Sequence, residues 1–298
     1  MKKYLLIVSL AILIIMPITG AYKISEEINN EITDPLNVSS EEQTHTVMVE
    51  FATLTTCPPC VTASGQLKSI YNSGDFDFYF VSIVSDYSNY NLKGRLYDLG
   101  VSSVPDVFFD GEYKDIIGGQ SSETPYRNTL TQASQRDVPD IDINVNAEWK
   151  GNGAIKIDVD VINNEPEDYN GLLRVYIVEK ESRWDDLGGN PYNFAAIAMP
   201  MDRSLALPKS GVKSMGETYS FSKTWRGSIF GFGDITQENT MVIASVFDKD
   251  SGHAVQAAAE QPTSASGKLF DFLSSIPFFN LFQIIASQIL FNRILKTF

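Results

Sequence analysis

Cysteine, histidine and clustered positive charge are all scarce in this sequence. Its 298 residues include two cysteines and two histidines, and its formal net charge is −14. The negative charge and the lack of a lysine or arginine cluster argue against nucleic-acid binding by the folded part. A zinc site would need His45 and His253 to complete the cysteine pair, and these look like parts of different domains. We therefore expect neither a bound metal nor a cofactor.

The two cysteines that are present stand together. They form Cys57-Pro58-Pro59-Cys60, shortly after a hydrophobic run, Val47–Phe51, that is typical of a strand. Two intervening residues let one sulfur reach the other, so the pair can alternate between a dithiol and a disulfide that a partner thiolate opens. A purely structural disulfide more often closes a long loop. The motif predicts thiol–disulfide exchange, with a structural disulfide as the alternative.

The N-terminal segment has the order of a signal peptide. Residues 1–21 contain Lys2 and Lys3, then an apolar stretch, then small residues ending at Ala21. We expect export to a compartment in which a disulfide persists, with an uncleaved signal anchor as the main alternative. Residues 22–44 are polar and acidic and are predicted to be a flexible spacer.

The C-terminal segment, residues 263–298, is predicted to be a linker and a hydrophobic helix. An uncharged stretch from Phe272 to Asn292 is long enough to cross a bilayer. Arg293 and Lys296 follow it, and the positive-inside rule places them in the cytoplasm. We expect residues 269–298 to tether the protein to a membrane with its folded part outside. A helix lying at the interface, or docked on the protein's own core, is the alternative.

Residues 45–137 read as one α/β unit, because predicted strands and helices alternate before a hairpin at Asp110-Gly111 and a closing helix. The expected strands are 46–53, 76–84, 106–109 and 113–117, and the expected helices are 57–71, 92–99 and 124–134.

Three short motifs occur together in this unit. Glu50 lies in the strand before the Cys-x-x-Cys, Val104-Pro105 precedes a strand, and Gly118-Gly119 follows the hairpin. In these motifs the unit resembles the thioredoxin superfamily. The resemblance implies a thioredoxin-like fold in which Pro105 is a cis-proline facing the disulfide and the Val104 backbone pairs with a substrate peptide. On sequence alone, an ordinary trans proline is the default.

The resemblance also implies roles for the polar residues. Cys57, at the helix N-terminus, is expected to attack, and Cys60, one turn further, to resolve the mixed disulfide. Glu50 lies one position upstream of the family's buried acid, and by resemblance it is a candidate proton relay. A solvated strand residue is the alternative.

From residue 138 to 262 the pattern changes to alternating apolar and polar residues. Seven short predicted strands favour an all-β sandwich. Their number and the turn signals between them fit an immunoglobulin-like sandwich. The segments Glu238–Asp248 and Val255–Ala258 carry a resemblance to prokaryotic surface proteins related to outer-membrane lipoproteins. Within residues 138–262, Glu181–Asn193 is the longest polar insertion and is a candidate for contact with a partner or with the first domain.

These features together predict an extracytoplasmic, membrane-tethered thiol–disulfide oxidoreductase. Its partners would be thiols and disulfides of exported proteins and a redox partner protein. The alternative is a non-catalytic surface binding module in which the thioredoxin-like unit is only a scaffold, since a fold does not fix a function.

Overall fold

The computed structural model describes residues 43–209 and 218–264, which form a mixed α/β, sheet-rich fold. The predicted signal peptide, nearly all of the predicted spacer and the predicted membrane tether lie outside these residues. Within the described part, no helix is long and apolar enough to cross a membrane.

The first part of the chain has the expected order of elements. They are β1 (Val47–Thr53), α2 (Pro58–Ser73), β2 (Phe78–Val84), α3 (Tyr90–Asp98), β3 (Asp106–Phe109), β4 (Lys114–Ile117) and α4 (Thr124–Ser134). Strand β1 lies parallel to β2 and antiparallel to β3, and β3 forms a hairpin with β4. Every residue of β1 is buried, as expected of a strand that is covered on both faces.

Seven strands follow, where the alternating pattern predicts them. They are β5 (Ile141–Gly151), β6 (Ala154–Asn163), β7 (Tyr169–Asp185), β8 (Pro191–Leu207), β9 (Thr218–Arg226), β10 (Thr240–Asp248) and β11 (Ala254–Glu260), with a 3-10 turn, η1 (Gly227–Phe230), after β9. Strand β6 shows the strict alternation of a half-buried strand. Strands β7 and β8 are much longer than the sequence indicates, and they take up most of the polar insertion as one extended hairpin.

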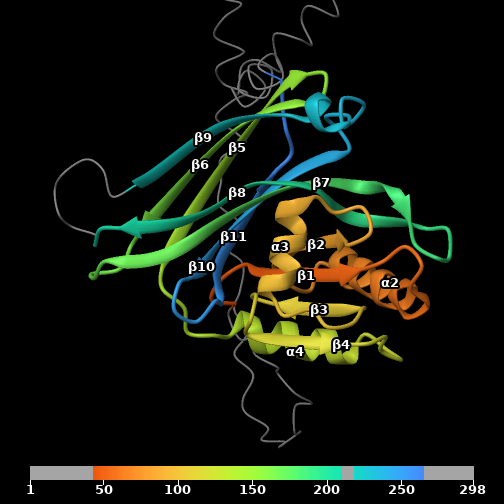
Figure 1. Ribbon diagram of the computed structural model, residues 1–298. Coiled ribbons are helices and arrows are strands. Elements are labelled where there is room, and N and C mark those ends of the chain that lie inside the picture. The colour runs from red at the N-terminus through yellow and green to blue at the C-terminus, as the bar shows by residue number, and fades with distance from the viewer. Residues whose placement is uncertain (1–42, 210–217, 265–298) are drawn as a thin grey trace, which may run out of the picture. The chain divides into compact units, whose positions relative to one another are not determined.

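Strands from both halves of the chain join in a single sheet (Figure 1). The order is β11-β10-β7-β8-β2-β1-β3-β4, while β5, β6 and β9 form a separate sheet. The junction is a parallel pairing of Ser82 in β2 with Ala195 in β8, and the Ser82 hydroxyl donates to the Asn193 carbonyl at 2.7 Å. The predicted boundary between 137 and 138 falls between α4 and β5, yet the larger sheet continues across it.

Two hydrophobic cores reflect this arrangement. One lies between the three-stranded sheet and strands β7, β8, β10 and β11. The other lies around β1 and β2, and it includes side chains from the second half of the chain, among them Tyr176, Tyr192 and Phe247. Phe194 of β8 packs edge-on against Tyr71 of α2, with ring centroids 4.8 Å apart. The helix that carries the cysteines is therefore packed on both halves.

Local sequence explains where helix α2 begins and ends. Cys57 is its N-cap, and Pro58 and Pro59 occupy the first turn, where a missing backbone N–H costs no helical hydrogen bond. The helix ends at Ser73, and its C-cap is Gly74, whose φ of 69° is left-handed and suits glycine. These prolines fix the cysteine pair at the helix start.

Candidate functional site

Cys57 and Cys60 form a disulfide at the start of α2. The sulfurs are 2.05 Å apart and the two Cα atoms 5.3 Å apart. The Cys57 amide donates to the Leu54 carbonyl at 3.3 Å, and the Cys60 amide donates to the Cys57 carbonyl at 3.2 Å. The loop before the helix is thus held by its own backbone.

The two cysteines differ in access. Cys57 keeps 6 % of its surface exposed, whereas Cys60 has 0 %, and Thr56, Pro58 and Pro59 around them are exposed. An incoming thiol therefore meets Cys57 first. This asymmetry fits an attacking and a resolving sulfur, because exchange depends on access to the attacked sulfur.

The second predicted motif is connected to the loop that carries the disulfide. The Val104–Pro105 bond is cis. The Pro105 carbonyl accepts a hydrogen bond of 2.7 Å from the Gly118 amide, and at Gly119 an added Cβ would come 3.0 Å from Cβ of Pro59. This chain of contacts joins the cis-proline to the Cys-Pro-Pro-Cys loop. Val104, just before β3, is half-buried.

Glu50 is fully buried in an ion pair. Its carboxylate receives two hydrogen bonds from Arg95 of α3, at 2.6 and 2.8 Å, and one from the Tyr176 hydroxyl of β7 at 2.6 Å. Burial alone raises the pKa of Glu50, but the charge and hydrogen bonds of Arg95, with the charge of Arg174 and the hydrogen bond of Tyr176, together outweigh burial and hold the pKa below its ordinary value. The carboxylate is ionised at neutral pH.

The alternative that Glu50 is a solvated strand residue is wrong, because its exposed fraction is 0 %. Its hydrogen bonds within the described part of the chain lead to α3 and β7 rather than to the cysteines. A carboxylate with a lowered pKa is a poor proton acceptor near neutral pH. The proton-relay role stays a prediction, and these contacts favour a structural role instead.

Asp106 directly follows the cis-proline, and sequence reasoning missed it. Its side chain is buried, and its Oδ1 has no hydrogen-bond partner among the described residues. Burial, reinforced by the carboxylate of Asp115, raises the pKa of Asp106 to about 7. The only signal in the sequence was an acidic residue placed immediately after Val104-Pro105.

We expect Asp106→Asn to increase stability above pH 7 and to change it little at pH 4. A carboxyl whose pKa is raised in the fold holds its proton more tightly than the unfolded chain does. The contribution of Asp106 to the free energy of unfolding of the native protein therefore falls as pH rises from about 4 to about 7. The gain in the variant at pH 8 should be about 2–4 kcal/mol, because each unit by which the pKa is raised corresponds to about 1.4 kcal/mol. Urea unfolding at pH 4 and pH 8 measures it, and an equal difference at both values would contradict the assignment.

The two histidines lie away from the cysteines. His45 Nε2 is 2.9 Å from the Asp110 carboxylate, and the His253 ring packs edge-on against Tyr113. Within residues 43–209 and 218–264, no three His, Cys, Asp or Glu side chains are grouped so that they would hold a metal ion.

Comparison with known structures shows a likeness of fold. HBP35 of Porphyromonas gingivalis matches with a TM-score of 0.57 at 9% sequence identity, over 75% of this chain and 78% of that one. A protein of Agrobacterium tumefaciens matches with a TM-score of 0.43 at 11% identity, over 73% and 94%. A domain of the outer membrane lipoprotein Omp28 from Porphyromonas gingivalis matches with a TM-score of 0.22 at 16% identity, over 44% and 96%. No protein-family model and no curated protein matches the chain.

Proposed function

We propose that this chain is an extracytoplasmic thiol–disulfide oxidoreductase that acts on exported proteins through Cys57 and Cys60. The observation that carries the proposal is a disulfide at a helix start whose first cysteine keeps 6 % of its surface exposed while the second keeps 0 %. The contacts that link Pro105, through Gly118 and Gly119, to Pro59 support the same conclusion. In this proposal residues 45–137 have a thioredoxin-like fold, residues 138–262 an immunoglobulin-like sandwich, and residues 269–298 tether the protein to a membrane.

The exchange needs only the two sulfurs and the substrate. A substrate thiolate attacks Cys57 Sγ, the Cys57–Cys60 bond breaks, and Cys60 leaves as a thiolate. A second substrate thiolate then attacks the substrate sulfur of the mixed disulfide and releases Cys57. The substrate gains a disulfide and the cysteine pair takes up two electrons, which a redox partner protein must remove. With a reduced pair and an oxidised substrate the same steps run in reverse.

Glutathione disulfide distinguishes the two sulfurs. With Cys60→Ser, the Cys57 thiolate should take up one glutathione that no neighbouring thiol removes. With Cys57→Ser, the buried Cys60 should react at least about tenfold more slowly, because exchange follows access to the thiolate. Mass spectrometry of both variants over time measures the uptake. Equal rates in the two variants, or uptake in neither, would refute the proposed division of roles.

One observation favours the alternative of a binding module. A groove of about 450 Å³ lies between the start of α3, strand β8 and the segment from β9 to η1. Exposed apolar side chains stand along it, namely Tyr90, Ile229 and Phe230. Neither Cys57 nor Cys60 lines this groove. A function of ligand binding in the groove would therefore give the cysteine pair no part.

A further inference from the structure

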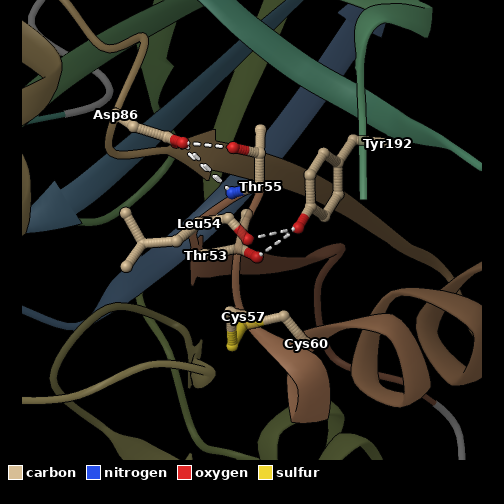
Figure 2. The surroundings of a disulfide bond; sticks show 7 residues. All are labelled: Thr53, Leu54, Thr55, Cys57, Cys60, Asp86 and Tyr192. Carbon is tan, nitrogen blue, oxygen red and sulfur yellow. Dashed lines mark hydrogen bonds between the residues drawn. A yellow bond between two sulfur atoms is a disulfide. The ribbon is translucent and has the colours of Figure 1, made fainter. Parts of the chain in front are cut away.

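The carbonyl oxygen of Leu54 accepts two hydrogen bonds in the loop before Cys57. One comes from the Cys57 amide at 3.3 Å, and the other from the Tyr192 hydroxyl at 2.9 Å. Figure 2 shows this hydroxyl directed at the loop that leads from β1 to the disulfide. Tyr192 belongs to β8, in the second half of the chain. A residue outside the thioredoxin-like unit therefore shares an acceptor with the attacking cysteine.

The hydroxyl of Tyr192 is fixed in direction. The Thr53 hydroxyl donates to it at 2.9 Å, which leaves its own hydrogen for Leu54. The ring is fully buried and packs edge-on against Phe51, with centroids 6.3 Å apart. Burial raises the pKa of Tyr192, so the hydroxyl is a donor at neutral pH. A buried hydroxyl that takes part in two hydrogen bonds has little freedom to reorient.

The hairpin that carries Tyr192 also lies against helix α2 just after Cys60. At its turn, the Asp186 carboxylate accepts from the amides of Gly188 and Asn190 at 2.8 and 3.0 Å. An added Cβ at Gly188 would lie 3.2 Å from Cγ1 of Val61, the residue after Cys60. The β7–β8 hairpin thus contacts both the loop before Cys57 and the helix after Cys60.

We propose that Tyr192 is a positioning residue for the Cys57–Cys60 couple and acts through the Leu54 carbonyl. Its hydrogen bond holds the loop where the Cys57 sulfur meets that of Cys60, and so it raises the effective concentration of one thiol for the other. The closed disulfide requires the loop before Cys57 to be in this position, whereas the dithiol form tolerates other positions of the loop. The hydroxyl therefore favours the disulfide over the dithiol. This inference rests on the proposed function, because it gives the hairpin a part in the exchange.

The test is the dithiol-to-disulfide ratio of the full chain in thiol redox buffers. Tyr192→Phe removes only the hydroxyl and should raise this ratio about fivefold, as expected for the loss of one net hydrogen bond. Thr53→Val, which frees the hydroxyl to turn away from Leu54, should shift it in the same direction by a smaller factor. The matched control is Tyr169→Phe. Tyr169 has a buried hydroxyl with no partner among the described residues and belongs to the other core.

A purely structural role gives a different result. It would lower the stability of both redox forms alike and leave the ratio unchanged. A ratio for Tyr192→Phe within about twofold of the Tyr169→Phe control, or one shifted towards the disulfide, would overturn the inference. If glutathione does not reduce the native pair at all, the proposed function fails, but dithiothreitol buffers still compare the variants. The two failures are therefore distinguishable.

Discussion

Arg95→Met is expected to lower the free energy of unfolding by about 3–5 kcal/mol at neutral pH, because it leaves the buried carboxylate of Glu50 without the guanidinium that donates two hydrogen bonds to it. Both side chains are almost completely inaccessible, at 2% for Arg95 and 0% for Glu50. The Tyr176 hydroxyl, the other donor to Glu50, remains but carries no charge. Urea unfolding at pH 7 measures the loss.

The chain offers a matched control in Arg127→Met. Arg127 also pairs with carboxylates, those of Asp75 and Glu123, but these side chains are far more accessible. Such surface pairs contribute little to stability, so the loss in Arg127→Met should be clearly smaller than that in Arg95→Met. If Arg95→Met and Arg127→Met lowered the free energy of unfolding equally, the buried Arg95–Glu50 pair would contribute no more to stability than a surface pair.

The pH dependence and a rescue test the same assignment. The pKa of Glu50 is lowered in the fold, so the contribution of the pair is present above the unfolded value of 4.5 and is lost as pH falls through the folded pKa. The difference in the free energy of unfolding between the native protein and Arg95→Met should therefore become smaller in acid. Adding Glu50→Gln to Arg95→Met removes the orphan charge and should recover part of the loss.

This ion pair belongs to the contacts that join the two halves of the chain. Glu50 lies in β1, Arg95 in α3 and Tyr176 in β7. Two guanidinium groups lie over the ring of Phe247 in β10. That of Arg95 is 5.0 Å from the ring centroid and that of Arg174 is 4.6 Å from it. We expect unfolding in Arg95→Met to affect both halves, since these contacts cross between them.

Local patterns predict the elements well, and long-range pairing is what they miss. The alternation in β6 and the prolines at the start of α2 act through near neighbours, so the sequence shows them directly. The parallel pairing of Ser82 with Ala195 depends on the register of strands far apart in the chain. No periodicity within either strand specifies that partner.

The candidate site divides in the same way. The cysteine pair and the Val104-Pro105 motif are visible in the sequence, because a short spacing carries their chemistry. Glu50 is misread in part, since its partner Arg95 lies in a helix whose pattern gives no sign of a buried guanidinium. Tyr192 lies in a polar insertion and reaches Leu54 only because β7 and β8 extend as one long hairpin.

The reduction potential of the Cys57–Cys60 couple tests the central claim most directly. An exchange catalyst must pass its disulfide to other thiols or regain it from them, so its potential has to lie near that of its surroundings. Known exchange proteins span about −270 to −120 mV, whereas structural disulfides of secreted proteins lie below about −300 mV. At two electrons per disulfide, 30 mV corresponds to about 1.4 kcal/mol, so the two classes are well separated.

The measurement is an equilibrium titration of the full chain against mixtures of reduced and oxidised glutathione, with the free thiols of Cys57 and Cys60 counted after acid quenching. We predict reversible conversion with a potential of about −270 mV or higher. A potential below about −300 mV, or a disulfide that no glutathione mixture opens, would contradict the account and leave Cys57–Cys60 a structural bond.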